Sequence, residues 1–267
     1  MTSVLFPGEL RDGQARRTMK SVVFIKRVPD TDSRIRIAPG GTEIETAGLK
    51  YVMNPYDESA LEAALQIRSL EGEGTVTVVS AGIPESVDVL RNALARGADD
   101  AVLLTMDTGS EGLPLAEVVA AELRDRDFDI AFFGVQSIDD NQGAVGPMVA
   151  ELLELPAATS VVSFRAASGS VEAIRAIEGG VEVVQLRMPC ILTITKGGYE
   201  PRLPSLKGIM AAKTRPLEEK PVTPGPAQLR TLSLELLPER TAGRIVGEGV
   251  GAVPELIRLL HEDVKVI

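Results

Sequence analysis

The chain has 267 residues, of which 44% are hydrophobic, and a formal net charge of −10 at pH 7. This length can bury a substantial core, but the acidic balance and an aromatic content of only 3% argue against binding to nucleic acid. The single cysteine, Cys190, excludes an intramolecular disulfide and a cysteine-based metal cluster. Its apolar neighbours predict a buried structural thiol.

The termini and the one histidine add three expectations. His261 lies in a helical pattern near the C-terminus, where we expect it to face solvent, and no nucleophile elbow accompanies it, which disfavours a Ser/His/Asp hydrolase. No apolar run approaches the ~20 residues that span a bilayer. Residues 1–18 are polar and lack the apolar segment of a signal peptide, so we expect a disordered extension, with Met19 a candidate start, and a cytoplasmic protein.

Strand and helix patterns alternate through the first part of the chain. Strands are predicted at residues 21–25, 75–80, 101–105 and 130–134, and helices at 55–70, 84–95, 113–124 and 146–155. Four such βα units predict an α/β fold with a doubly wound, mostly parallel sheet and helices on both faces. Ligands on sheets of this kind bind beyond the carboxyl ends of the strands.

The pattern changes after Pro156, where strands follow one another closely. They are predicted at 158–164, 171–177, 181–186 and 191–195, with a hairpin turn at Glu178-Gly179-Gly180, and they indicate an antiparallel addition to the same sheet. From Thr214 to Pro238 periodicity is lost among five prolines, which predicts an arm along a neighbouring surface. A short amphipathic helix follows at 254–260. We therefore divide the chain into an α/β domain at 19–213 and a C-terminal arm with its helix at 214–267.

The loop after the fourth strand, Gly134 to Gly146, is the best candidate for a ligand site. Its three glycines permit close approach of the backbone to a phosphate, and N–H groups at the start of the following helix favour an anion. Asp139 and Asp140 are candidates to accept hydrogen bonds from ribose hydroxyls. An ordinary capped loop without a ligand is an equally good interpretation of the spacing. Neither a P-loop nor a dinucleotide fingerprint is present.

Five segments, in order, are similar to one family. They are residues 26–31 (KRVPDT), 53–58 (MNPYDE), 134–140 (GVQSIDD), 173–193, and 206–213 (LKGIMAAK). The fourth carries a basic residue, an acidic-Gly-Gly turn, a further acidic residue, and a proline before an apolar run that ends in Thr193. From about residue 20 to residue 245 the chain resembles the electron-transfer flavoprotein β subunit.

The resemblance implies an adenine-nucleotide α-hydrolase-like fold and an electron carrier, not a substrate-transforming enzyme. An α subunit would supply most of a redox FAD site, while this chain completes its walls, holds AMP or a second FAD, and contacts the α subunit through its C-terminal arm. Electrons would pass from a flavin dehydrogenase, such as an acyl-CoA dehydrogenase, to a quinone oxidoreductase or another acceptor. Electron bifurcation is left open.

Carried over by motif, the resemblance implies a set of cofactor-binding residues at the strand ends and in the loop. They are Phe24, Ile25, Lys26, Asn54, Ala81, Gly82, Gly134, Gln136, Asp139, Asp140, Asn141, Gln142, Gly143, Ala144, Val145 and Gly146. AMP-binding members usually read Asn-Gln-Thr-Gly in this loop, whereas this chain reads Asn141-Gln142-Gly143-Ala144, closer to members with a second FAD. The residues do not decide between AMP and FAD.

Leu206 matches an apolar anchor that family members insert into a partner dehydrogenase. Without the resemblance, burial statistics favour a core leucine about three to one. Two rival functions remain: a universal-stress-type adenine-nucleotide-binding regulatory protein, which predicts a homodimer, and an adenylating ligase. The ligase needs an SGGxDS-like loop after the first strand, where this chain has Lys26-Arg27-Val28-Pro29-Asp30.

Overall fold

The computed structural model describes residues 18–106, 112–167, 169–238 and 243–267, so all of the predicted N-terminal extension except Thr18 lies outside it. The chain divides into two compact units. The larger comprises the described residues up to Ile35 together with Glu45–Arg230, and the smaller comprises Arg36–Ile44 and Thr231–Ile267. The division places residues 214–230, predicted as part of the arm, with the larger unit.

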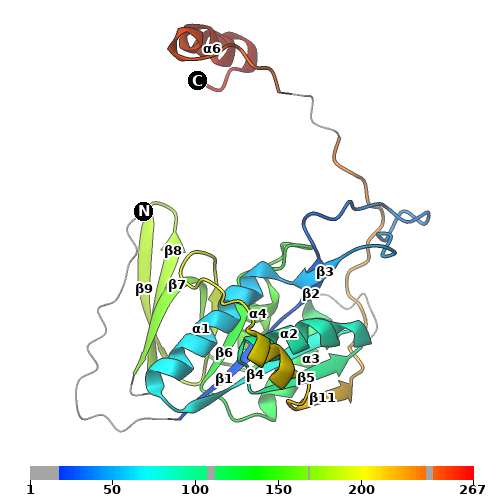
Figure 1. Cartoon of the computed structure of the whole chain (residues 1–267), viewed down its shortest axis with the longest axis vertical. Coiled ribbons are helices and arrows are strands. Elements are labelled where there is room, and N and C mark those ends of the chain that lie inside the picture. The colour runs from blue at the N-terminus through cyan, green and yellow to red at the C-terminus, as the bar shows by residue number, and fades with distance from the viewer. Residues whose placement is uncertain (1–17, 107–111, 168, 239–242) are drawn as a thin grey trace. The chain divides into compact units, whose positions relative to one another are not determined.

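A nine-stranded sheet forms the centre of the larger unit (Figure 1). Its order is β11 (Leu217–Pro221), β5 (Asp100–Thr105), β4 (Gly74–Gly82), β1 (Met19–Phe24), β6 (Ile130–Gly134), β10 (Cys190–Ile194), β7 (Ala157–Ala167), β8 (Ser170–Ile177) and β9 (Gly180–Arg187). From β11 to β7 neighbouring strands are parallel, and the pairs β7–β8 and β8–β9 are antiparallel. The fold class predicted from the sequence is confirmed.

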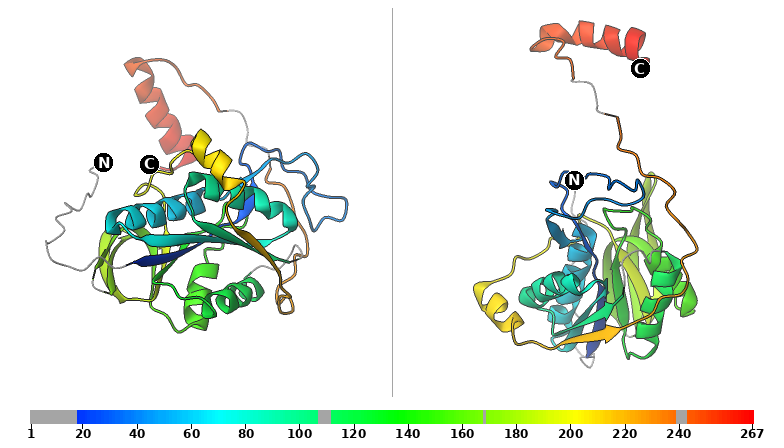
Figure 2. Two further views of the ribbon diagram at one scale, coloured as in Figure 1. Left: turned by 60° about the horizontal axis from the view of Figure 1, so that its bottom comes forward. Right: turned by 90° about the vertical axis from the view of Figure 1, so that its right-hand side faces the viewer.

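Helices cover both faces of the parallel strands (Figure 2). On one face α1 (Pro55–Glu71) and α2 (Val87–Arg96), which follows the short 3-10 turn η1 (Pro84–Ser86), pack over Val23, Val78 and Phe132. On the other, α3 (Leu113–Arg124) and α4 (Val145–Leu152) pack over Val22 and Ala131. Adjacent residues of a strand point to opposite faces, so the near-continuous apolar runs seen in the sequence supply both cores.

Two strands lie where the sequence pattern did not place them. β10 was expected in the antiparallel addition, but it runs parallel between β6 and β7. All of its residues are buried, as suits a strand covered on both faces. β11 falls in the segment expected to lack periodicity, and it pairs parallel with β5 as an edge strand. Close spacing in the chain indicated neighbours in space, but the chain leaves the β8–β9 hairpin after Arg187 and returns to the sheet's interior.

The remaining elements are small. β2 (Arg27–Pro29) and β3 (Tyr51–Met53) form a separate antiparallel pair within the connection from β1 to α1. In the smaller unit the turn η2 (Val250–Ala252) leads into α6 (Val253–Leu259) and a π-helical turn η3 (Leu260–Val264), where the helix was predicted. There His261 is exposed, as expected. Among the described residues, no helix is both long and apolar enough to traverse a bilayer.

Cys190 is buried at the start of β10 in the interior of the sheet, which confirms the prediction of a structural thiol. Burial, with the nearby Asp129 carboxylate adding to it, raises the pKa of the thiol to about 12. At neutral pH the reactive thiolate is therefore nearly absent from the folded chain.

Candidate functional site

A pocket lies at the carboxyl ends of the central strands. The chain runs from β1 to β4 and β5 on one side, then crosses to β6 on the other, so β1 and β6 flank the point where the strand order reverses. Ligands of open α/β sheets bind in the crevice at this point. The pocket has an empty volume of about 720 Å³, open solvent included. The crevice expected from the βα pattern is thus present.

Most of the predicted cofactor-binding residues line this one pocket. Gly82, Asp139 and Asn141 are the exceptions. Val135 and Ser137 also line the pocket and belong to the predicted loop, although they were not named singly. The sequence analysis missed the lining residues on the strands, on α1 and at or in α3, namely Asp57, Val79, Gly112, Leu115, Val119 and Phe133. Val79 and Phe133 lie near the carboxyl ends of two parallel strands, so the strand-end rule contained the signal that would have found them.

One part of the pocket is lined by apolar side chains. The Phe24 ring at the end of β1 stacks on the Phe133 ring of β6, with centroids 4.7 Å apart and planes 9° from parallel. Val79, Leu115 and Val119 add aliphatic surface from β4 and α3. Such a surface suits the face of a planar heterocycle better than it suits a phosphate.

A charged cluster lies at the rim of the pocket. The Lys26 ammonium lies 2.8 Å from an Asp139 carboxylate oxygen and 3.1 Å from one of Asp140. Burial alone would lower the pKa of Lys26, but the two carboxylates outweigh it and raise the pKa above its ordinary value. Asp140 also accepts hydrogen bonds from the Ser137 hydroxyl (2.6 Å) and the Gln142 N–H (3.1 Å). The cluster therefore holds the loop against the end of β1.

The ribose contacts expected of Asp139 and Asp140 stay a prediction. Both carboxylates bind Lys26, so a ribose hydroxyl would share or replace these contacts. Asn54 is likewise engaged: its amide donates to the Gln136 carbonyl (2.9 Å) and accepts from the Ile138 N–H (3.3 Å). Asn54 lines the pocket and also fixes the loop.

The loop ends in a turn that presents backbone N–H groups. Gly143 has φ +60°, a conformation that strains other residues, and a Cβ there would lie 3.1 Å from the Val135 carbonyl oxygen. Helix α4 starts at Val145, and its first intrahelical bond runs from the Met148 N–H to the Ala144 carbonyl. The N–H groups of Ala144, Val145 and Gly146 have no acceptor within the helix, and Pro147 carries no N–H. Ala144, Val145 and Gly146 all line the pocket, which suits an anion at its rim.

Asp57 stands apart as a buried carboxylate in the first turn of α1, 6% exposed. One oxygen accepts the Lys26 N–H at 2.8 Å and the other accepts the Gly134 N–H at 3.1 Å. Burial raises the pKa of Asp57 to about 7, although these N–H donors, Asn54 and the Lys26 charge favour the ionised form. The group therefore titrates near neutrality.

This titration predicts a pH dependence of stability. The folded pKa of about 7 lies above the ordinary value of 3.8, so the contribution is fully present below pH 3.8 and is lost as the pH rises through 7. Between pH 5 and pH 8 the free energy of unfolding of the wild type should fall, relative to Asp57→Asn, by about 2–3 kcal/mol. Chemical denaturation of both proteins at several pH values checks this. A constant difference across the range contradicts it.

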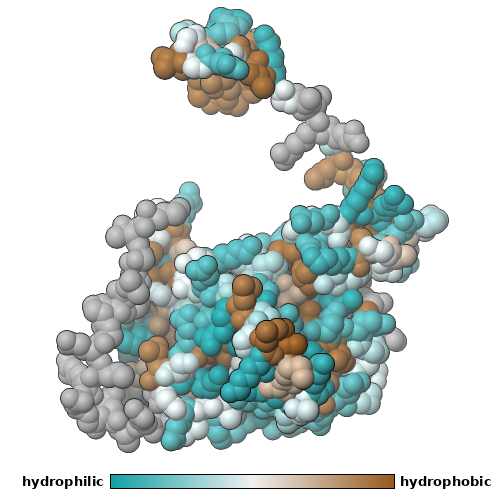
Figure 3. Space-filling model, in the orientation of Figure 1, coloured by the Kyte–Doolittle hydropathy of each residue, from teal (hydrophilic) through white to brown (hydrophobic). Residues whose placement is uncertain are grey.

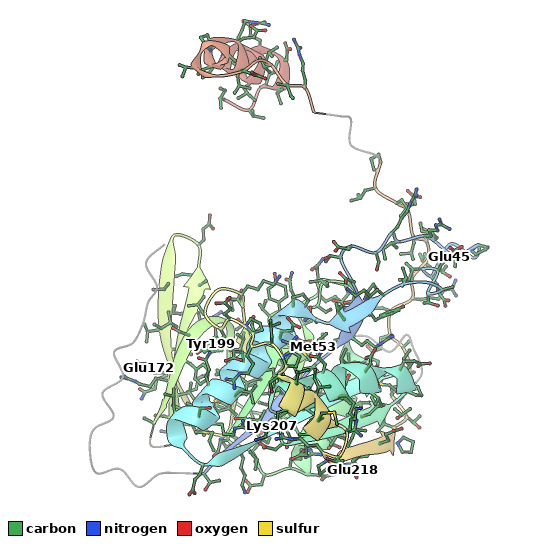
Figure 4. The ribbon with its side chains drawn as sticks, in the orientation of Figure 1. Glu45, Met53, Glu172, Tyr199, Lys207 and Glu218 are labelled. Carbon is green, nitrogen blue, oxygen red and sulfur yellow. The ribbon has the colours of Figure 1, made fainter. Side chains whose placement is uncertain are left out.

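A second candidate site surrounds Leu206, the first residue of α5 (Leu206–Ala212). Leu206 is 85% exposed and Leu203 is 86% exposed, with Met210 exposed beside them in sequence. Apolar surface gathers over α5 in Figure 3, and Figure 4 labels Lys207 on the same helix. We call Leu203, Leu206 and Met210 the α5 patch. Leu206 is a surface residue, not a core residue.

A helix cap, an ion pair and two side-chain hydrogen bonds hold the α5 patch on the α/β core. The Ser205 hydroxyl accepts the Gly208 N–H at 3.0 Å and caps the helix. Before it, the Arg202 guanidinium binds both oxygens of the buried Glu62 on α1, at 2.7 and 2.9 Å. At the other end, the Arg91 side chain of α2 donates to the carbonyls of Ala212 and Arg215. An apolar anchor held in this way is preorganised for contact with another protein.

The fold and the two sites define an α/β protein with a ligand pocket at the switch point of a parallel sheet and a separate exposed apolar patch. A family model, "Electron transfer flavoprotein domain", matches residues 42–224. The chain belongs to this family. The resemblance inferred from the five sequence segments is thus confirmed, and neither rival function is favoured.

Individual relatives cover the chain almost completely. Electron transfer flavoprotein subunit beta of Bacillus subtilis is 36% identical over an alignment of 260 residues that covers 93% of this chain and 100% of the relative. The subunit of the same name from Bradyrhizobium diazoefficiens is 33% identical over 250 residues, with the same coverage of both chains. The mitochondrial subunit beta of Arabidopsis thaliana is 34% identical over 258 residues, again 93% and 100%.

Proposed function

We propose that the chain is the β subunit of a heterodimeric electron-transfer flavoprotein in the cytoplasm. An α subunit would hold most of the redox FAD, which supplies the electron chemistry when bound, and this chain would complete its walls. The observation that carries the proposal is the pocket at the β1–β6 switch point, in a chain of this family, with two stacked aromatic rings and the start of helix α4 among its lining.

The pocket is assigned to an adenine nucleotide, either AMP or the adenylate half of a second FAD. The stacked Phe24 and Phe133 rings and the aliphatic side chains of Val79 and Leu115 would contact the base. The phosphate would lie by the backbone of Gly143 to Gly146, where N–H groups point out of the start of α4. Lys26 would stay near the phosphate, with its charge shared between Asp139 and Asp140.

The α5 patch is assigned to the docking of a flavin dehydrogenase, with an acyl-CoA dehydrogenase one candidate. Leu206 is the apolar anchor, and Lys207 and Lys213 lie on the same short segment, where they would attract an acidic partner. A quinone oxidoreductase or another acceptor would take the electrons onward. The exposed Leu203 and Leu206 are held on the fold by the Arg202–Glu62 ion pair and by the Ser205 helix cap.

The smaller unit is assigned to contact with the α subunit. Leu232, Leu237 and Ile245 are exposed in its extended part, and Leu256 and Ile257 are exposed on α6. Burial of this many apolar side chains against a partner would stabilise the complex. The chain expressed alone should aggregate, and co-expression with an α subunit should give a stable 1:1 complex. A well-behaved monomer or homodimer in light scattering, indifferent to the α subunit, would contradict this.

Denaturing the purified complex and measuring the released nucleotides tests the cofactor assignment. One FAD plus one AMP per heterodimer supports an electron carrier of the AMP-binding kind. Two FAD per heterodimer supports a second flavin here, and with it electron bifurcation. One FAD without a second nucleotide contradicts the assignment of the pocket, and a colourless homodimer would favour the universal-stress-type alternative.

A further inference from the structure

The ends of β1 and β6 separate where the pocket begins. Their pairing runs from Ser21 and Ile130 to Val23 and Phe132. Beyond it, the Asp57 carboxylate lies between the strands and accepts the Lys26 N–H from one and the Gly134 N–H from the other. The carboxylate thus takes the place of ladder hydrogen bonds and bridges the two strand ends.

Both strand ends form walls of the pocket. Phe24, Ile25 and Lys26 line it from the β1 side, and Gly134, Val135 and Gln136 line it from the β6 side. We propose that Asp57 is a positioning residue for the nucleotide, whose carboxylate sets the separation of these two walls before the nucleotide binds. The proposal rests on the assignment of the pocket to an adenine nucleotide and goes beyond it, since Asp57 was not among the predicted site residues.

The surroundings leave Asp57 little freedom. A Cβ on Gly134 would lie 2.3 Å from an Asp57 carboxylate oxygen and 2.8 Å from the Tyr56 Cβ, so Gly134 allows the close approach of this helix to β6. The same turn begins with Asn54, which grips the Gln136 carbonyl and the Ile138 N–H. In Figure 4, Met53 marks the end of β3 that leads into this turn. The single turn from Asn54 to Asp57 therefore holds both pocket walls and the loop after β6 in place.

Only a group with two acceptors satisfies this position. The two oxygens of a carboxylate accept one backbone N–H each, whereas an asparagine amide can accept only one and turns its NH₂ toward the other N–H. Two facing donors repel, and a buried donor without an acceptor is costly. In Asp57→Asn the strand ends must therefore shift, although the size of the side chain is unchanged.

Asp129 provides a matched control at the opposite end of the same two strands. One of its carboxylate oxygens accepts the Lys20 N–H of β1 at 2.9 Å, and its own N–H donates to the Lys20 carbonyl at 2.8 Å. Asp129 is 6% exposed, like Asp57, and it does not line the pocket. If Asp57 served only to join β1 to β6, replacing either aspartate would change nucleotide affinity to the same extent.

The test compares wild type, Asp57→Asn and Asp129→Asn as heterodimers with the α subunit. Nucleotide-depleted protein is titrated calorimetrically with AMP, or with FAD if the wild type retains two, and the melting temperature is recorded. We expect Asp57→Asn to bind the nucleotide roughly 10- to 100-fold more weakly, a loss like that seen when a residue that orients the direct ligands of a bound metal is replaced. Asp129→Asn should bind the nucleotide as the wild type does. Equal affinity of Asp57→Asn and wild type, or equal losses in both variants, overturns the proposal.

Hydrogen exchange on the wild type keeps the proposal testable should Asp57→Asn not fold. If the walls are set in advance, the amides of Lys26 and Gly134 stay protected in the nucleotide-free heterodimer. Rapid exchange at both amides that slows only on adding nucleotide overturns the proposal. A wild type that binds neither AMP nor FAD overturns the nucleotide assignment itself, and that outcome is distinguishable because it does not depend on any variant.

Discussion

A Leu206→Ala variant is expected to bind its partner dehydrogenase roughly 1–3 kcal/mol more weakly, or about 5- to 150-fold in affinity, with its fold intact. The side chain is 85% exposed at the start of α5, so truncating it leaves no cavity. A core leucine would instead cost roughly 2–5 kcal/mol of stability. Measuring electron transfer from the dehydrogenase together with the melting temperature of the same variant separates these cases.

Leu70→Ala serves as the matched control for this prediction. Leu70 lies near the end of α1, away in sequence from the α5 patch, and is 68% exposed. The Leu70→Ala variant should keep both the stability and the dehydrogenase turnover of the wild type. A Leu206→Ala protein with a much lower melting temperature and unchanged turnover would show that the assignment of an anchor fails at this position.

A Gly143→Val variant is expected to lose most of the nucleotide from the pocket. Valine at φ +60° is strained, and its Cβ would start 3.1 Å from the Val135 carbonyl oxygen, so the loop must move. Its branched side chain would then occupy the space where the phosphate is assigned. We expect the released nucleotide per heterodimer to fall to a small fraction of the wild-type amount, with the redox FAD retained.

Gly179→Val separates this effect from backbone strain in general. Gly179 lies in the β8–β9 turn with φ +75°, and a Cβ there meets no atom within 4 Å. The strain is therefore of the same kind, but the pocket is elsewhere. Normal nucleotide content in Gly179→Val and depleted content in Gly143→Val is the expected pair of results. Equal depletion in the two variants would attribute the loss to strain alone.

The sequence predicted the parallel part of the fold because each βα unit is a local pattern. β1, β4, β5 and β6 were each anticipated by a short apolar run followed by a helical period. The position of β10 was not anticipated, since the choice between a hairpin neighbour and the sheet's interior depends on long-range packing. β11 was missed because LEEKP carries neither an apolar run nor a clear alternation; its place comes from pairing with β5.

The residues of the candidate site also fall into those that local sequence patterns predicted and those that long-range contacts determine. Glycines and polar residues in one loop made residues 134–146 recognisable, and the pocket contains most of them. Asp57 escaped notice because an acidic residue in the first turn of a helix has an ordinary explanation in the helix dipole. Its contacts with Lys26 and Gly134 join residues far apart in the chain. For Leu206, burial statistics favoured the core, whereas the family resemblance indicated the surface, and the side chain is exposed.

The buried Cys190 gives this chain an internal reporter of its own opening. Its thiol is covered in the sheet's interior and has a pKa of about 12, so alkylating reagents reach it only when β10 separates from its neighbours. When labelling is slow compared with reclosing, the rate of modification measures the fraction of molecules in which the central sheet is open. Because the sequence contains no other cysteine, a single labelled peptide identified by mass spectrometry would report this opening with and without nucleotide in the pocket.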